Sequence, residues 1–206
     1  MPRRARVVQP REYYHVLNRG SLRARLFDTA RDYRAFVRLL ADTVDKFTLP
    51  LLSYCVMPNH WHLIVRPEHA QHLSKSMHWL TCTHAHRWCH AHERNGPGPL
   101  YQGRFKAIQV QQDLHLLRAC RYVERNALKA KLVDRAEDWR WCSANQRVRN
   151  HTAPCLLPLP FLSPEGWIRC LNEPPEDEAF AAAIRKNKPF GDDEWITGPE
   201  TPVENA

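Results

Sequence analysis

The sequence predicts an α+β fold, in which a ferredoxin-like antiparallel sheet carries helices on one face and a C-terminal appendage follows. The first observation is the order of the expected elements, β-α-β-β-α-β-α, because sequential elements of this kind build a layer of strands covered by helices. The second is a turn signal at Pro58-Asn59 between two apolar runs, which predicts a hairpin. The third is a change of composition after about residue 150.

Four short segments predict the strands. They are Tyr13–Leu17, Leu49–Val56, His60–Arg66 and Arg104–Val110. The second and third flank the turn at Pro58-Asn59, and the fourth alternates apolar and polar side chains. These four segments supply the predicted sheet.

Three segments predict the helices of the body. The first follows Phe27-Asp28-Thr29 and runs to Lys46, and its apolar residues recur at helical spacing. The second runs from His72 to about His92, and the third from a cap at Asp113 to about Lys131. Together with the strands they make residues 1–150 one predicted domain.

Residues 151–206 form the predicted appendage. Pro154, Pro158, Pro160 and Pro164 lie close together, and an acidic stretch containing Pro174-Pro175 follows. We expect short helices and loops in this proline-rich acidic segment.

Charge divides the chain in the same place. Residues 1–150 hold 26 Lys and Arg against 12 Asp and Glu, a net charge of +14, whereas residues 151–206 hold 4 against 10, a net charge of −6. A strongly basic body indicates a polyanionic partner, of which nucleic acid is the commonest. Arginine predominates over lysine, which favours paired contacts to phosphate and stacking on bases. The alternative is a charge that serves solubility alone.

The sequence gives no sign of a membrane partner. No apolar run reaches the roughly 18 residues of a membrane helix, and no apolar stretch follows the basic N-terminus as in a signal peptide. The seven cysteines have no paired spacing, so we expect reduced thiols. These features predict a cytoplasmic protein.

His60-Trp61-His62 opens the third predicted strand. Side chains alternate along a strand, so His60 and His62 point to one face and Trp61 points to the other. Two imidazoles on one face of a strand suit a metal ion. The alternative is two unrelated polar positions on a half-exposed strand.

The third predicted helix carries Arg118, Tyr122 and Asn126 at intervals of four residues, which places them on one helical face. A guanidinium, a phenol and an amide are therefore aligned. A helical tyrosine at such a position is either a residue at the edge of the core or a nucleophile.

Five separated segments resemble the single-tyrosine HUH transposases of the IS200-like superfamily and, within them, the REP-associated tyrosine transposases. They are HVLNRG (15–20), YCVMPNHWH (54–62), YQGRFK (101–106), YVERN (122–126, with Leu128 and Lys129) and DWRWCS (138–143). The resemblance covers residues 10–145 and implies the HUH endonuclease fold.

The resemblance also implies the roles of four residues. His60 and His62 correspond to the metal-binding histidine pair, Tyr122 to the nucleophile, and Asn126 to the third metal ligand. The implied cofactor is a divalent cation, Mg²⁺ or Mn²⁺, although imidazole ligands by themselves favour zinc or manganese. Members commonly have proline after the helical asparagine, where this chain has Ala127.

The implied reaction is cleavage and rejoining of single-stranded DNA that folds into imperfect hairpins. A phenol has an unperturbed pKa of about 10 and is therefore both a weak nucleophile and a reasonable leaving group. The family forms a 5′-phosphotyrosine, from which a free 3′-hydroxyl rejoins the DNA. The general base is left open, with His15 as one candidate.

Eight cations are expected to contact DNA through phosphates. They are Arg3, Arg4, Arg6, Arg19, Arg104, Lys106, Arg118 and Arg125. We expect about half of them to touch phosphate, the rest being solvated charges, and the chain to act as a monomer or a homodimer.

Three alternatives remain at the level of sequence. One is a rolling-circle replication initiator or relaxase, which shares the histidine pair, and another is a DNA-hairpin-binding protein without catalysis. The third concerns Cys82, His86 and Cys89, which lie on one side of the second predicted helix and suggest a zinc site. They lack the spacing of known zinc fingers, so a solvated face is the preferred interpretation.

Overall fold

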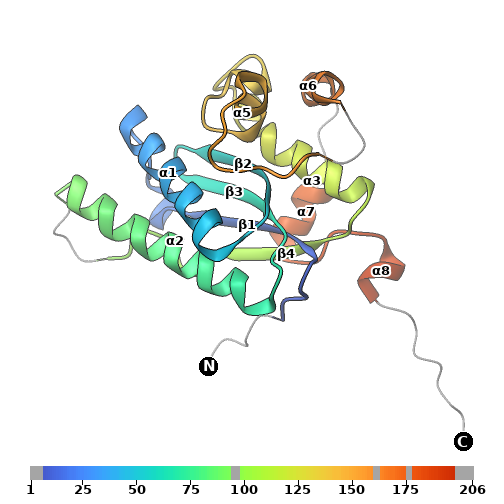
Figure 1. Cartoon of the computed structure of the whole chain (residues 1–206), viewed down its shortest axis with the longest axis horizontal. Coiled ribbons are helices and arrows are strands. Elements are labelled where there is room, and N and C mark those ends of the chain that lie inside the picture. The colour runs from blue at the N-terminus through green and yellow to red at the C-terminus, as the bar shows by residue number, and fades with distance from the viewer. Residues whose placement is uncertain (1–6, 94–97, 160–162, 175–177, 198–206) are drawn as a thin grey trace, which may run out of the picture.

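The computed structural model describes residues 7–93, 98–159, 163–174 and 178–197. Its centre is an antiparallel sheet with the strand order β2-β3-β1-β4 (Figure 1). The strands are β1 (Tyr13–Arg19), β2 (Leu51–Met57), β3 (His60–Val65) and β4 (Lys106–Val110). All four predicted strands are present, and the hairpin joins β2 to β3. The predicted α+β class is confirmed.

Eight α-helices surround the sheet in the part of the chain that is described. They are α1 (Ala30–Phe47), α2 (Ala70–Ala91), α3 (Leu114–Glu124), α4 (Asn126–Lys129), α5 (Ser143–Arg149), α6 (Pro164–Asn172), α7 (Glu178–Lys186) and α8 (Asp193–Thr197). Two short 3₁₀ helices, η1 (Ser21–Arg23) and η2 (Ala136–Asp138), lie in connections. No helix of these described ranges is long and apolar enough to cross a membrane.

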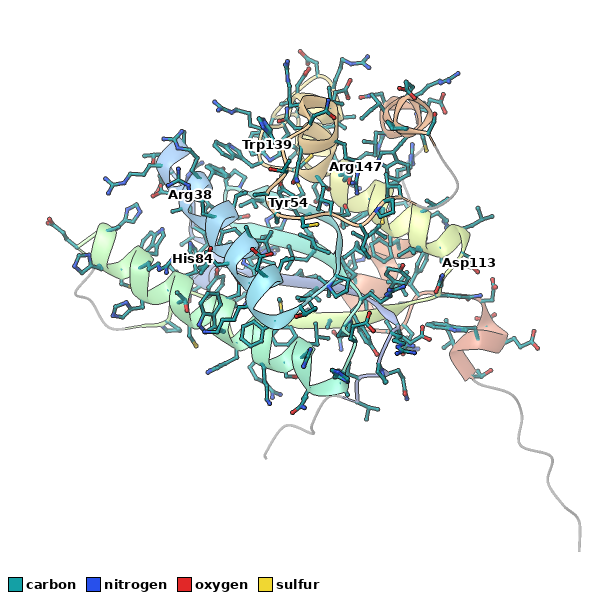
Figure 2. The ribbon with its side chains drawn as sticks, in the orientation of Figure 1. Arg38, Tyr54, His84, Asp113, Trp139 and Arg147 are labelled. Carbon is teal, nitrogen blue, oxygen red and sulfur yellow. The ribbon has the colours of Figure 1, made fainter. Side chains whose placement is uncertain are left out.

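Helices α1 and α2 cover one face of the sheet, as predicted (Figure 1). Helix α1 begins with a capping box, in which Thr29 accepts from the backbone of Asp32 and Asp32 accepts in return. On this face Trp61 is fully buried, and its Nε1 donates to the hydroxyl of Tyr101. His84 of α2 (Figure 2) is bonded to the same hydroxyl at 2.6 Å.

The other face of the sheet is also covered, which corrects the prediction of helices on one face. Helices α3, α6 and α7 pack there, and Ile64, Val123, Trp167 and Phe180 share one buried cluster. The reason is visible in β2, where all seven residues are buried. A strand buried on both sides needs a layer of structure on each face.

The last predicted helix of the body is divided. Helix α3 ends at Glu124 and α4 begins at Asn126, whereas one helix to about Lys131 was expected. Arg125 lies between them with ψ at −4°, which departs from helical geometry. Its guanidinium donates to the backbone carbonyls of Leu171 and Glu173, which ties this break to the end of α6.

Glu124 anchors the end of α3 inside the protein. Its side chain is fully buried, and one carboxyl oxygen accepts from the hydroxyls of Ser53 and Ser143. The other oxygen accepts from Nε1 of Trp167 at 2.7 Å. Nη2 of Arg147 lies 3.8 Å from the carboxyl group. The residue therefore joins α3 to β2, α5 and α6.

Replacing Glu124 by alanine is expected to lower the free energy of unfolding by about 3–5 kcal/mol, because removing one member of a buried polar group leaves its partners unsatisfied. Urea unfolding followed by tryptophan fluorescence measures the loss. The control is Glu165→Ala on the exposed first turn of α6, for which we expect a loss below about 1 kcal/mol. Equal losses in the two variants would contradict the anchoring role.

Candidate functional site

His60 and His62 occupy one face of β3. His62 is paired in register with Leu17 of β1 and Cys55 of β2, and it is almost completely buried. His60 is half-buried and is paired with Arg19. The two ring centroids are 4.9 Å apart. As the sequence predicted, Trp61 between them enters the core of the opposite face.

Each ring of the histidine pair has a hydrogen-bond partner at Nδ1. The side-chain oxygen of Asn59 lies 2.6 Å from Nδ1 of His60. Nε2 of His15, on β1, lies 2.7 Å from Nδ1 of His62. Within the described residues no hydrogen bond involves Nε2 of either member of the pair. The atoms that remain for a ligand are therefore the two Nε2 nitrogens.

The electrostatic environment keeps these imidazoles uncharged at neutral pH. Burial, with Arg19 nearby, lowers the pKa of His60 to about 4. Burial, followed by the neighbouring His60, lowers the pKa of His15 to about 3 and holds the pKa of His62 well below its ordinary value. A neutral imidazole keeps a lone pair, which is the form that binds a metal cation.

Tyr122 of α3 lies over the same face as the histidine pair. Its ring meets the ring of His62 edge to face, with centroids 6.0 Å apart. The ring of Phe180, from α7, packs against Tyr122 at 5.1 Å. The predicted nucleophile and the predicted metal-binding face are therefore adjacent within one chain.

Asn126 follows Tyr122 by one helical turn and is tied to it. Its Nδ2 donates to the carbonyl of Tyr122 at 2.9 Å and to that of Val123 at 3.3 Å. Because the amide nitrogen is bound to the helix backbone, the amide oxygen remains as an acceptor. Imidazole nitrogens and an amide oxygen are ligand types that suit a divalent cation.

His15 does not contact the phenol in the way that a general base requires. Its ring is 1% exposed, is stacked beside His62, and meets the ring of Phe180 at 5.2 Å. Its hydrogen bond goes to Nδ1 of His62 instead. The structure therefore supports a role for His15 in holding His62.

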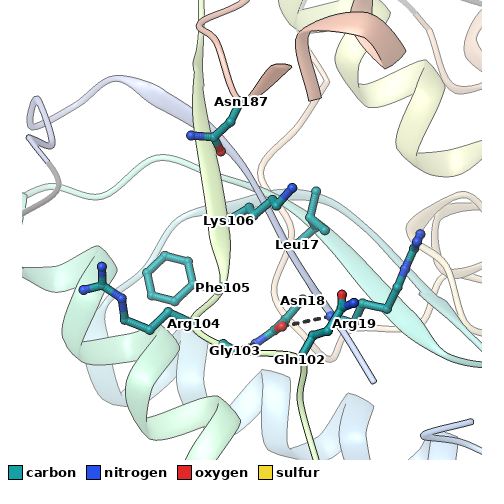
Figure 3. Close-up of a pocket in the computed structure, with 9 residues that line it drawn as sticks. All are labelled: Leu17, Asn18, Arg19, Gln102, Gly103, Arg104, Phe105, Lys106 and Asn187. Atoms are coloured by element: carbon teal, nitrogen blue, oxygen red, sulfur yellow. Dashed lines mark hydrogen bonds between the residues drawn. The ribbon is translucent and has the colours of Figure 1, made fainter. Parts of the chain in front are cut away.

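A pocket of about 470 Å³ opens at the end of β1 (Figure 3), where Leu17 and Arg19 are paired in register with His62 and His60. Its walls are the end of β1 (17–19), the segment 102–106 and Asn187. Asn18 joins the first two walls by donating to the carbonyl of Gly103 at 3.2 Å. Three of the predicted DNA-binding cations, Arg19, Arg104 and Lys106, line this pocket.

The remaining predicted DNA-binding cations are placed differently. Arg118 is exposed, and its guanidinium lies 5.1 Å from the ring centroid of Phe190. Arg125 is engaged by backbone carbonyls at the end of α6. Arg3, Arg4 and Arg6 lie outside the described residues. Three of the eight predicted DNA-binding cations therefore lie together at this pocket.

A second group of possible metal ligands lies away from the histidine pair. Asp113, His115 and Asp192 are the three residues of this type that meet in the described chain. Nδ1 of His115 is 2.8 Å from Asp113, which also caps α3 by accepting from the backbone of His115. The carboxyl group of Asp192 accepts a hydrogen bond from Nε2 of Gln111, and the backbone N–H of Asp192 donates to Oε1 of Gln111. This group attaches the C-terminal segment to the start of α3.

The cysteines and histidines of α2 do not converge on a metal site in the described residues. Cys82 is exposed and contacts His78 of its own helix, and His86 is exposed as well. A solvated helix face, the preferred interpretation from the sequence, agrees with this arrangement.

Two residues of the site were not predicted from the sequence. Asn59 was interpreted only as a turn residue. Its position directly before His60 is the feature of the sequence that could have indicated a hydrogen bond to that ring. Phe180 lies in the segment interpreted as an appendage, and nothing in its local sequence indicates contact with Tyr122.

Residues 9–126 match a family model described as "Transposase IS200 like". The match covers more than half of the chain, so this protein belongs to the IS200-like transposases and is a DNA-processing enzyme of that family. The family predicted from the five segments is confirmed. No curated protein matches the chain.

Two solved structures are similar in fold. A REP-associated tyrosine transposase bound to a REP hairpin matches with a TM-score of 0.58 and 16% identity, over 79% of this chain and 92% of that chain. A putative transposase from Deinococcus radiodurans has a TM-score of 0.42 and 16% identity, over 74% and 99% of the two chains. The first match shows that the fold is shared.

Three buried histidines and one half-buried histidine predict a pH-dependent stability. They are His15, His60, His62 and His84, and each has a pKa below the ordinary 6.5. Below about pH 6.5 the unfolded chain binds protons that the folded chain does not, so stability falls as the pH is lowered from 6.5 toward 4. Each histidine contributes a slope of at most about 1.4 kcal/mol per pH unit.

Urea unfolding at a series of pH values measures this slope. His84→Gln removes one of the four groups and should make the slope measurably shallower. His90→Gln on the exposed face of α2 serves as the control and should leave the slope unchanged. Identical slopes for both variants and the wild type would contradict the assignment.

Proposed function

We propose that this protein cleaves and rejoins single-stranded DNA hairpins, similar to REP palindromes, through a 5′-phosphotyrosine at Tyr122. One observation carries the proposal, namely that the phenol ring of Tyr122 lies against His62 on the metal-binding face of the sheet. Membership of the IS200-like transposases supports the class of reaction.

In the first step the Tyr122 oxygen attacks a phosphorus atom of the DNA backbone and loses its proton. The bond from phosphorus to the 3′ oxygen breaks, which leaves a 3′-hydroxyl and a phosphotyrosine on the 5′ side. In the second step a 3′-hydroxyl attacks that phosphotyrosine and restores a phosphodiester, with Tyr122 as the leaving group. No external energy source is needed, because the aryl ester keeps the energy of the broken bond.

His60, His62 and Asn126 are the residues that would hold a divalent cation, which we propose to be Mg²⁺ or Mn²⁺. When bound, such an ion supplies charge neutralisation at the non-bridging phosphate oxygens. The protein contributes neutral imidazoles with open Nε2 atoms and an amide oxygen one turn beyond the nucleophile. These groups would hold the ion on the face of the sheet where the ring of Tyr122 lies.

The basic pocket is the proposed route of the DNA strand toward Tyr122. Arg19 connects the pocket to the histidine pair, because it lines the pocket and is paired in register with His60. A REP hairpin is bound in the solved REP-associated relative. We propose a partner of the same kind here, with phosphates held by Arg19, Arg104 and Lys106 and exposed bases read by edge contacts and stacking.

The contact between Tyr122 and His62 within one chain supports catalysis in cis. A monomer then contains a complete site. Mixing an excess of Tyr122→Phe chains with His62→Ala chains should restore no cleavage, because neither chain holds both groups. Restored cleavage would show that tyrosine and histidines come from different chains of a dimer.

Tyr122→Phe is expected to abolish cleavage and the covalent adduct while preserving DNA binding. The substitution removes one oxygen from a half-buried ring and keeps the ring contacts to His62 and Phe180. The measurement is an assay on a labelled hairpin oligonucleotide with Mn²⁺, read as product length and as a protein-DNA adduct on denaturing gels. Binding is followed by fluorescence anisotropy.

Two controls separate the alternatives. His62→Ala should also lose cleavage, and wild-type cleavage should stop in EDTA. Wild-type cleavage by the phenylalanine variant would remove Tyr122 as nucleophile. A wild-type chain that binds hairpins but never cleaves them would instead identify a DNA-binding protein without catalysis.

The double variant Arg104→Ala with Lys106→Ala is expected to weaken hairpin binding and to reduce the dependence of affinity on salt. Each lost phosphate contact lowers the slope of log K against log salt by about 0.7 to 0.9. The matched control is Arg31→Ala with Arg34→Ala on α1, which covers the opposite face of the sheet. Equal effects of the two double variants would show that general charge, and not the pocket, binds the DNA.

A further inference from the structure

We propose that Asn59 and His15 are positioning residues that fix the tautomers of His60 and His62, so that both rings present Nε2 to the cation. The inference rests on the proposed function, because it concerns the cation of that same site. It assigns a role to two residues that are themselves outside the proposed ligand set.

The tautomer of His60 follows from its partner. The side-chain oxygen of Asn59 accepts hydrogen bonds and cannot donate, so Nδ1 of His60 must carry the proton. The orientation of the Asn59 amide is fixed independently, because its Nδ2 donates to the carbonyl of Arg23 at 3.1 Å. Nε2 of His60 is thereby left with its lone pair.

Asn59 is also held by its backbone. Its carbonyl accepts from the backbone N–H of Gly20 at 2.8 Å, at the end of β1. A Cβ atom at Gly20 would lie 2.3 Å from the carbonyl oxygen of Ala24, so the close approach of Ala24 to Gly20 requires glycine. Asn59 is therefore fixed through both its side chain and its backbone. Its hydrogen bond in turn fixes the orientation of the His60 ring.

The pair formed by His15 and His62 shares a single proton. Two N–H groups cannot face each other at 2.7 Å, and two bare nitrogens would repel, so one nitrogen donates and the other accepts. If Nδ1 of His62 donates, its Nε2 keeps a lone pair that faces the cation. If His15 donates, Nε2 of His62 carries a proton and cannot be a ligand. Binding of a cation therefore requires His15 as the acceptor.

The surroundings leave His15 free for this role. With Nε2 as the acceptor, neutral His15 carries its proton on Nδ1, which is buried without a hydrogen-bond partner in the described residues, so no other group competes for the orientation of the ring. Phe180 packs against the ring at an angle of 70° and holds it in place. Partners of this kind, which bind the second nitrogen of a ligating histidine, raise its basicity and fix its direction.

Two matched pairs of variants test the inference in the full-length protein. His15→Met and Asn59→Ala remove the acceptor, whereas His15→Gln and Asn59→Asp keep an oxygen acceptor near the same position. Titration with Mn²⁺, followed by the electron paramagnetic resonance of free Mn²⁺, gives the affinity. We expect a loss of about 10–100-fold for the first two variants and values close to wild type for the second two.

Affinities equal to wild type in the methionine and alanine variants would overturn the inference. An equal loss in all four variants would also overturn it, because packing and not the hydrogen bond would then be responsible. Thermal melting of each variant accompanies the titration.

A measurement without metal separates this inference from the proposed function. Nitrogen-15 NMR of histidine-labelled protein should show the proton of His60 on Nδ1, and Asn59→Ala should release it. A wild-type protein that cleaves DNA but carries this proton on Nε2 overturns the inference alone. A wild-type protein with the proton on Nδ1 that neither binds Mn²⁺ nor cleaves hairpins overturns the proposed function and supports the tautomer assignment.

Discussion

The buried carboxyl group of Glu124 holds α3 at a fixed depth against the sheet, and the site depends on that depth. Tyr122 precedes Glu124 by two residues, and Asn126 follows it by two. Ser53 of β2, Ser143 of α5 and Trp167 of α6 all donate to this one group. Because the donors come from three separate elements, α3 cannot slide or rotate without breaking several buried hydrogen bonds at once. The ring of Tyr122 is thereby kept beside His62.

The C-terminal segment takes part in the site as well as in the core. The ring of Phe180, on α7, contacts the rings of His15, Tyr122 and Phe190. The backbone of Phe190 adds two hydrogen bonds to the edge of β4. An acidic segment is therefore attached to the basic body through aromatic rings and backbone contacts, and the face that carries the histidines has an apolar wall.

Much of the fold and of the site was predictable from local patterns. The alternation that separates His60 and His62 from Trp61 depends only on the geometry of a strand, and the interval from Tyr122 to Asn126 depends only on the period of a helix. The cap at Thr29 and the turn at Pro58-Asn59 are local in the same way. The second covered face of the sheet was not predicted, because the apolar character of β2 does not say which segment will bury it.

The sequence by itself determined the strands, the approximate positions of α1, α2 and α3, the family, and the residue types that we propose bind a cation and attack a phosphate. Only the tertiary structure decided that α3 lies on the histidine face, that His15 pairs with His62 rather than with Tyr122, and that Arg125 is bound to carbonyls. The physical reason is the distance along the sequence over which each interaction acts. Backbone periodicity and caps act over a few residues and are written in the local sequence, whereas the approach of Phe180 or Trp167 to α3 joins residues more than forty positions apart. Such contacts depend on how all the buried surfaces fit together.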